Sequence, residues 1–306
     1  MENSFVHLHA HTEYSMLDGA AKIEPFLNRI LELEQPGAAI TDHGNLYGAL
    51  EFYNSAIEKK LKPIIGYEAY VISDSRFERP DRKNNKRYHL TLLAENTVGY
   101  WNLVEMASKA FTEGYYYKPR IDYELLKKYS EGIIALSGCL GGEIAQLLAP
   151  DGSVEEGNQG QTRSFDDALK KAEFYQSIFG EKNFFIELHK HGIKQQEDIL
   201  PDLLKISEKL SAPLVAANDS HYVHSDDASA HDALLCVQTN ATLDDENRFK
   251  FDGSGFYIKS SEEMRDLFPN EKFPDACNNT IKILDRVEYE FEKDTYYLPD
   301  FPIDDS

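Results

Sequence analysis

The chain of 306 residues has little cysteine and no long apolar run. Its three cysteines, Cys139, Cys236 and Cys277, are odd in number and far apart, which argues against a disulfide framework and fits a reducing cytoplasm. No apolar run approaches the roughly 20 residues of a membrane span, and no charged-then-apolar leader precedes Phe5. We therefore expect a cytoplasmic protein with no membrane partner.

Positive charge is also scarce: Lys and Arg number 32 against 53 Asp and Glu, a net charge of −21. Because proteins bind DNA largely by neutralising phosphates, we expect the isolated chain to bind DNA poorly. The exception is the basic loop, residues 76–87 (RFERPDRKNNKR), with six basic and two acidic residues. This loop either guides a DNA strand or is solvated surface, as charge runs usually are. The residues predicted to contact DNA are Arg82, Lys83, Lys86 and Arg87.

The most informative motif is VHLHAHTEYSMLD at residues 6–18. His7, His9 and His11 alternate with apolar residues, and a period of two places side chains on one face of a strand. Asp18 follows seven residues after His11. Imidazole plus carboxylate is the ligand chemistry of zinc, manganese or iron rather than calcium or magnesium. The motif predicts a metal site more strongly than it predicts a core strand with hydrogen-bonded histidines.

Polar residues recur where short apolar runs end. The runs at 37–41, 62–67, 132–137 and 213–217 are typical of buried parallel strands. They lead to Asp42-His43-Gly44, Glu68, Gly138-Cys139 and Asn218-Asp219-Ser220-His221. Chemistry placed at the ends of several strands predicts an α/β barrel, in which active sites lie where strands end and loops begin.

A coarse pass along the chain predicts alternating strands and helices. The expected strands are 5–9, 38–41, 63–71, 90–94, 133–137, 184–188 and 214–217. The expected helices are 22–34, 46–59, 98–111, 123–128, 143–148, 165–179 and 195–210, with further helices near 228–237, 261–268 and 275–287. Seven strand–helix units indicate a seven-stranded barrel. The glycine-rich segment 151–163 lacks periodicity, so we expect a mobile insertion there.

Six segments carry a resemblance to a known family. They are HLHAHTEYSMLDG, AAITDHGNLYGALEFYNSA, KPIIGYEAYV, HLTLLAENTVGYWNLVEMAS, GIIALSGCLGGEIAQLL and VAANDSHYV. The chain resembles the PHP (polymerase and histidinol phosphatase) domain, in the form found at the N-terminus of bacterial DNA polymerase III alpha subunits of the DnaE type. YYYKPRIDYELL resembles the polymerase branch in particular. The resemblance implies the PHP fold, a distorted (βα)7 barrel of the α/β class with a metal site at the C-terminal ends of the strands.

The resemblance also implies which residues bind metal. Carried over residue by residue, the ligands are His9, His11, Asp18, His43, Glu68, His89, Cys139, Asp219 and His221. Nine ligands are too many for one ion and suit three divalent ions, whether zinc, manganese or iron. We assign catalytic roles to Asp18, His43 and Asp219. His89 departs from the barrel pattern because it precedes its expected strand, so either that boundary is misplaced or a loop folds back over the mouth.

On this resemblance we expect a PHP domain at 1–287 and an acidic connector at 288–306 that leads towards a polymerase palm absent from this chain. The implied activity is a metal-dependent 3′–5′ exonuclease, in which a metal-activated hydroxide hydrolyses the terminal phosphodiester and so proofreads for the polymerase. The fragment should have no polymerase activity. The implied partners are the 3′ end of DNA, the polymerase module of the same parent chain and other replisome subunits.

Two alternatives remain open. A small-molecule phosphomonoesterase of the histidinol-phosphatase type would use the same ligands, although the polymerase-like segment and the acidic connector count against it. A non-catalytic structural or docking domain of the polymerase has little reason to retain all nine ligands. Glu187 and His189 alternate along the sixth expected strand, and for these two residues we expect substrate contact or simple solvation.

Overall fold

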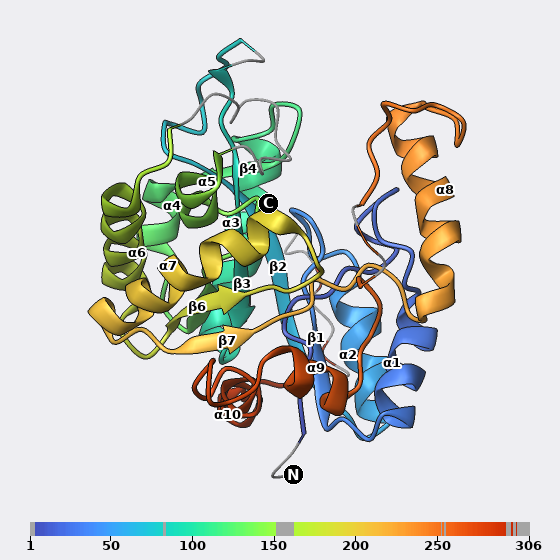
Figure 1. The fold of residues 1–306 in the computed structure, drawn as a ribbon. Coiled ribbons are helices and arrows are strands. Elements are labelled where there is room, and N and C mark those ends of the chain that lie inside the picture. Colours follow the sequence, from blue (N-terminus) through green and yellow to red (C-terminus); the bar gives the residue numbers. More distant parts are fainter. Residues whose placement is uncertain are drawn as a thin grey trace, which may run out of the picture.

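The computed structural model describes residues 4–81, 84–150, 162–251, 253, 255–291, 295 and 298 (Figure 1). The strands are β1 (Gly37–Ile40), β2 (Lys62–Ile72), β3 (Tyr88–Ala94), β4 (Arg120–Asp122), β5 (Ile133–Leu136), β6 (Phe184–Leu188) and β7 (Leu214–Ala216). The helices are α1 (Ile23–Glu32), α2 (Ala49–Glu58), α3 (Thr97–Thr112), α4 (Tyr123–Lys128), α5 (Glu143–Leu148), α6 (Phe165–Phe179), α7 (Lys194–Leu210), α8 (Ala228–Thr239), α9 (Ser261–Leu267) and α10 (Asn278–Arg286). Most of the predicted insertion lies outside the described residues.

The strands form one sheet whose two edges are bridged by the N-terminal segment. The order is β1-β2-β3-β5-β6-β7, with β4 paired to β2. His7 pairs with Ala38 of β1, while Ala10 pairs with Ser220 beyond β7. Residues 7–10 therefore lie between the first and the last strand, as in the predicted distorted barrel. The expected strand 5–9 is not a continuous ladder, because the segment bonds to one neighbour at His7 and to the other at Ala10.

Strand β3 runs against its neighbours. It is antiparallel to both β2 and β5, whereas β1 with β2, β5 with β6 and β6 with β7 are parallel. A parallel return needs a crossover connection, usually a helix, and the described residues between β2 and β3 contain no α-helix. Seven strand–helix units would place all strands in one direction, and β3 departs from that pattern because a buried apolar run does not reveal its direction. The reversal puts the start of β3 beside the ends of the parallel strands.

The barrel interior is apolar and is closed at one end by α10. The interior cluster takes side chains from the N-terminal segment and from the strands: Val6, Leu8, Ala39, Ile64, Leu93, Ile134, Leu136, Phe185 and Val215. Ile283, Leu284 and Val287 of α10 and its C-terminal end complete the cluster. The N–H of Val6 donates to Thr280 Oγ1 over 3.1 Å, which fixes α10 to the start of the chain. The opposite end, the barrel mouth, is left for polar groups.

Helices cover the outside of the sheet. In Figure 1, α6 and α7 lie on one side of the strands, with α1, α2 and α8 on the other. No helix among the described residues is both long and apolar enough to cross a membrane. The first residues of the predicted connector pack on this body: Glu288 N–H donates to Glu95 O over 2.8 Å, and the Phe291 ring lies 4.3 Å from that of Tyr53.

Candidate metal centre

Inward-facing residues of the strands change from apolar to polar as they approach the mouth. Every second residue of a strand points to the same side, so one row carries both the core and the site. Four such rows are Ile64–Gly66–Glu68, Leu93–Thr91–His89, Phe185–Glu187–His189 and Val215–Ala217–Asp219. The row of β3 reads backwards because that strand is antiparallel. His89 therefore belongs to the mouth as the second residue of β3, without a loop that folds back.

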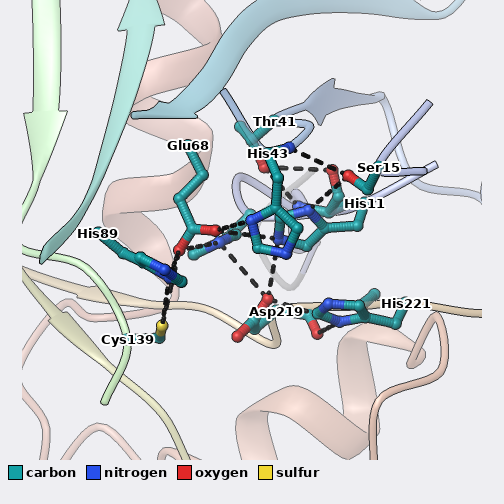
Figure 2. Close-up of polar contacts among 12 residues, drawn as sticks. His11, Ser15, Thr41, His43, Glu68, His89, Cys139, Asp219 and His221 are labelled. Carbon is teal, nitrogen blue, oxygen red and sulfur yellow. Dashed lines mark hydrogen bonds and ion pairs between the residues drawn. The ribbon is translucent and has the colours of Figure 1, made fainter. Parts of the chain in front are cut away.

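Glu68 lies at the centre of the cluster (Figure 2). Its Oε2 is 2.6 Å from Nδ1 of His43, and its Oε1 is 3.1 Å from Nδ1 of His89 and 3.3 Å from Nε2 of His9. Burial of this carboxyl would raise its pKa, but His89, His43 and His9 together hold the pKa of Glu68 well below its ordinary value. Glu68 is thus an anion held among three imidazoles.

Two aspartates complete the carboxylate set. Asp219 Oδ1 lies 3.1 Å from Nε2 of His11 and 3.4 Å from Nε2 of His9. Asp18 Oδ2 lies 2.8 Å from Nε2 of His43 and 4.0 Å from Nε2 of His221. Asp219 has a backbone φ of 45°, a left-handed conformation that Asp and Asn adopt more readily than most residues. The turn aims its side chain back into the mouth.

Hydrogen bonds fix the tautomers of three histidines. Ser15 Oγ donates to the carboxylate of Asp42 over 2.7 Å, so it accepts from Nδ1–H of His11 over 2.9 Å. Nδ1–H of His9 donates to Glu187 Oε1 over 2.7 Å, and Nδ1–H of His221 donates to the backbone oxygen of Asp219 over 2.9 Å. In each ring Nε2 faces the carboxylates, and in the neutral ring it is the atom free to bind a cation. A hydrogen bond at the far nitrogen is typical of metal-binding histidines.

Asp42, next to His43 in sequence, holds the loop that carries Asp18. Its carboxylate accepts from the backbone N–H of Thr12 over 2.7 Å and from the hydroxyl of Ser15. Asp42 is buried and does not face the cluster, so it shapes the loop between His11 and Asp18.

A glycine-rich turn brings Cys139 to the cluster. Sγ of Cys139 lies 3.6 Å from Glu68 Oε1 and 3.8 Å from Nδ1 of His89. The backbone of Gly141 accepts from the N–H of His89 over 2.9 Å, and a side chain at Gly141 would come within 2.8 Å of the His89 ring. Burial raises the pKa of the Cys139 thiol to about 11, and Glu68 adds to that shift. Without a cation Cys139 is therefore a neutral thiol.

The orphaned atoms of the cluster show that its donor set fits divalent cations. Buried atoms with no hydrogen-bond partner include His9 Nε2, His11 Nε2, Asp18 Oδ1, Glu68 Oε2, Asp219 Oδ1 and His221 Nε2. A buried polar group without a partner is costly, yet these six atoms come from the segment before α1, from β2 and from the turn after β7, and they meet in one place. Groups with metal-ligand spacing are His9–His11–Asp219, His43–Glu68–His89, His11–His43–His221 and His9–Glu187–His189.

Protonation can take the place of a cation in this cluster. Burial disfavours a charged imidazole, but Asp219, Glu187 and Glu68 raise the pKa of His9 well above its ordinary value. In the same way Glu68 and Asp18 raise the pKa of His43 to about 9 against the effect of burial. Metal binding at such a site releases protons, so we expect metal affinity to fall at low pH.

All nine residues predicted to bind metal lie in this one cluster, although their roles as ligands remain predictions. Glu187 is the residue that the sequence reasoning misjudged. It is 1% exposed rather than solvated, and it accepts from His9 and from the N–H of Gly138 over 2.9 Å. The inward row Phe185–Glu187–His189 was the available signal. His7 points away, and its Nε2–H donates to Lys259 O over 2.9 Å.

A cavity of about 390 Å³ opens over the cluster. Its lining includes Asp18, His43, Glu68, His89, Cys139, Asp219 and His221. The cavity is within the range of roughly 300–1,000 Å³ that is usual for small-ligand sites. Substrate can therefore reach the three carboxylates directly.

The basic loop is partly structural. Arg76 is buried and its guanidinium contacts Asp122 at 3.0 Å and Glu113 at 2.7 Å, so it is not available to DNA. Arg79 donates to the backbone oxygens of residues 76 and 113. Of the four predicted DNA contacts, Arg82 and Lys83 lie outside the described residues, while Lys86 is exposed and Arg87 is half-buried.

Comparisons with known proteins show the family of the chain. The PHP domain family matches residues 7–191. The chain is 45% identical over 304 residues to DNA polymerase III subunit alpha of Saccharopolyspora erythraea, covering 93% of this chain and 24% of that protein. It is 44% identical over 307 residues to the same subunit of Thermus aquaticus, covering 98% of this chain and 24% of that protein. The chain thus spans about a quarter of the length of these relatives.

Among solved structures, an amidohydrolase from Chromobacterium violaceum with bound sulfate aligns with a TM-score of 0.40 and 13% identity, covering 72% of this chain and 88% of that one.

Proposed function

The chain belongs to the PHP domain family, and we propose that it is the metal-dependent 3′–5′ exonuclease domain of a DNA polymerase III alpha chain, acting in the cytoplasm. The observation that carries this proposal is the convergence of unpaired imidazole nitrogens and carboxylate oxygens at the floor of an open cavity. The relatives support the polymerase context, since their printed name is that of a replicative polymerase subunit.

We assign the nine residues to three ions, each with its own carboxylate. Asp219 would serve one ion with His9 and His11, which lie within 3.4 Å of its Oδ1. Asp18 would serve another with His43 and His221. Glu68, His89 and Cys139 would form the third position, with Glu68 also reaching towards the other two. The mixture of imidazole, carboxylate and thiol suits zinc, manganese or iron.

Bound divalent ions would supply a hydroxide near neutral pH and neutralise charge on a phosphate oxygen. The protein contributes position: Glu187 and Ser15 hold the rings of His9 and His11, and Asp42 holds the loop that carries Asp18. Asp18, His43 and Asp219 line the cavity, so they face the phosphoester that enters it. The expected substrate is the last phosphodiester at the 3′ end of a DNA strand.

Tethering would reconcile DNA cleavage with a net charge of −21. A polymerase module on the same parent chain would present the DNA end at high local concentration. We therefore propose that 1–287 is the catalytic domain, that 288–306 leads to that module, and that the other replisome subunits act through the full polymerase.

The test compares substrates with the purified chain. Metal content is measured by elemental analysis, and cleavage of a 5′-labelled single strand is measured beside hydrolysis of histidinol phosphate, with and without a chelator. We expect stepwise loss of 3′ nucleotides that needs metal and is absent from Asp219→Asn. Faster hydrolysis of the phosphomonoester would favour a small-molecule phosphatase. Substoichiometric metal with no cleavage would indicate a structural domain.

A further inference from the structure

One wall of the cavity comes from outside the barrel strands. Phe249, Lys250, Phe251 and Phe256 line it, and they follow α8 in sequence. We call residues 248–251 the recognition arm. The proposed metal chemistry uses no side chain of the recognition arm, although the arm lies over the cluster of proposed ligands.

The recognition arm is held at both ends. Arg248 pairs with Asp232 of α8 through two contacts, Nη1 to Oδ1 at 2.5 Å and Nη2 to Oδ2 at 2.6 Å. Two parallel bonds between a guanidinium and a carboxylate fix direction as well as distance. At the other end the Phe251 ring packs edge-on against the ring of His221, with centroids 4.7 Å apart. Phe249 and Lys250 lie between these two fixed points.

Phe249 presents an aromatic ring that the protein covers only in part. Its side chain is 41% exposed, although it lines the cavity and touches Phe251 edge-on with centroids 5.8 Å apart. Flat aromatic rings beside a backbone-binding groove are what proteins use to stack nucleic-acid bases. A phosphoester that carried no base would leave this ring in water.

Lys250 places a long, exposed cationic side chain at the wall of the cavity, above the buried histidines. Among the cavity-lining residues in the described part of the chain it is the single Lys or Arg, and it is exposed. The floor of the same cavity carries Asp18, Glu68 and Asp219. An ammonium on a flexible stem is suited to contact a phosphate as a point charge.

We propose that the recognition arm selects a nucleotide: Phe249 stacks on the base of the 3′-terminal nucleotide, and Lys250 contacts a phosphate of the same strand. This inference rests on the proposed function, because it takes the cleaved phosphoester to be nucleic acid. The volume of about 390 Å³ suits one nucleotide at a time. The substrate class is therefore phosphoesters that bear a nucleobase.

Binding tests the proposal without cleavage. The metal-loaded chain is titrated by calorimetry with thymidine 5′-monophosphate and with 2-deoxyribose 5-phosphate, which lacks the base. We expect the nucleotide to bind about tenfold more tightly. Phe249→Leu should bring that ratio close to one, and Lys250→Gln should weaken both ligands alike. Trp101→Ala, an exposed aromatic in α3 that does not line the cavity, should leave the ratio unchanged.

Cleavage separates this inference from the proposed function. Single strands that end in a normal or an abasic 3′ nucleotide are compared by kcat/KM. If the wild type prefers the base and Phe249→Leu loses the preference, the inference stands. If the wild type cleaves DNA but the preference is absent or survives Phe249→Leu, the inference is overturned. A base preference in binding with no cleavage of DNA supports the inference and refutes the exonuclease.

Discussion

Glu187 is not a proposed ligand, but it holds the ring of the proposed ligand His9. Replacing Glu187 by glutamine should therefore weaken metal binding. One oxygen of Glu187 accepts from Nδ1–H of His9, and the other accepts from the N–H of Gly138. A glutamine has a single oxygen, so its NH₂ group must face one of these two donors. The ring of His9 then keeps only its longer contact to Thr91 Oγ1 at 3.2 Å, or the Gly138 N–H is left unpaired in the interior.

The expected loss follows from that geometry. Removing the hydrogen-bond partner of a metal-binding histidine lowers metal affinity roughly 10–100-fold, which corresponds to about 1.4–2.8 kcal/mol. An unpaired donor should lower the free energy of unfolding by about 1–3 kcal/mol. Metal affinity is measured by competition with a chromophoric chelator, and stability by urea unfolding of the metal-free protein.

Glu143→Gln is the matched control for this experiment. Glu143 is also buried and accepts from the hydroxyls of Tyr123 and Tyr175 at 2.7 Å each, but it does not line the cavity over the cluster. It should lose stability and keep its metal affinity. If Glu187→Gln binds metal as tightly as the wild type, or if Glu143→Gln weakens metal equally, the reasoning about His9 is refuted.

Four further outcomes are expected. Asp219→Asn should keep its circular dichroism spectrum, because Asn also tolerates a φ of 45°, and should lose all cleavage; cleavage by the folded variant would exclude Asp219 as a ligand. The His9→Ala/His11→Ala double variant should lose metal, activity and thermal stability, as chelated wild type should, and only the wild type should recover when metal is returned. Reversing the four predicted DNA contacts of the basic loop to glutamate should raise KM and flatten its salt dependence at unchanged metal content, whereas equal kinetics at low salt would make the loop ordinary surface. Burial lowers the pKa of His191 to about 3, so its contribution to stability is complete above its unfolded pKa of about 6.5 and is lost as the pH falls towards 3; His191→Gln should flatten the pH profile of unfolding in that window, and an unchanged profile would contradict this.

Spacing and strand ends predicted a barrel and most of the polar residues gathered at its mouth, whereas the full set of nine, His89 included, came from the family resemblance. The limits of β6, α4, α5 and α6 coincide with the predicted ranges, because buried apolar runs and helical periodicity are local properties. The short strand β4 was missed, since its three residues Arg120–Asp122 include two charged side chains. Burial of Arg120 depends on the carbonyl oxygens of residues 76, 78 and 114, which no local pattern reveals.

The sequence could not show the direction of a buried strand or the distant hydrogen-bond partner of a buried side chain. The run 88–94 is equally apolar whichever way it runs, so His89 looked misplaced until β3 was seen to be antiparallel. Glu187 was expected to contact substrate or to be solvated, because its partner His9 lies 178 residues away. Both errors concern contacts between distant segments, whereas the histidine spacing at 7, 9 and 11 is local and was informative.

Residues 7–11 join the first strand of the sheet to the turn after the last one, so the proposed metal site can be completed only late in synthesis. The N–H of His11 donates to Ser220 O over 2.7 Å, and the N–H of Ser220 donates to His9 O over 3.2 Å. His9 and His11 are synthesised well before their carboxylate partner Asp219, which follows about 210 residues later in the chain. At about 5–20 residues per second the ribosome needs roughly 10–40 s to cover that distance. The two histidines therefore emerge long before Asp219, and an ion captured in that interval would lack this carboxylate.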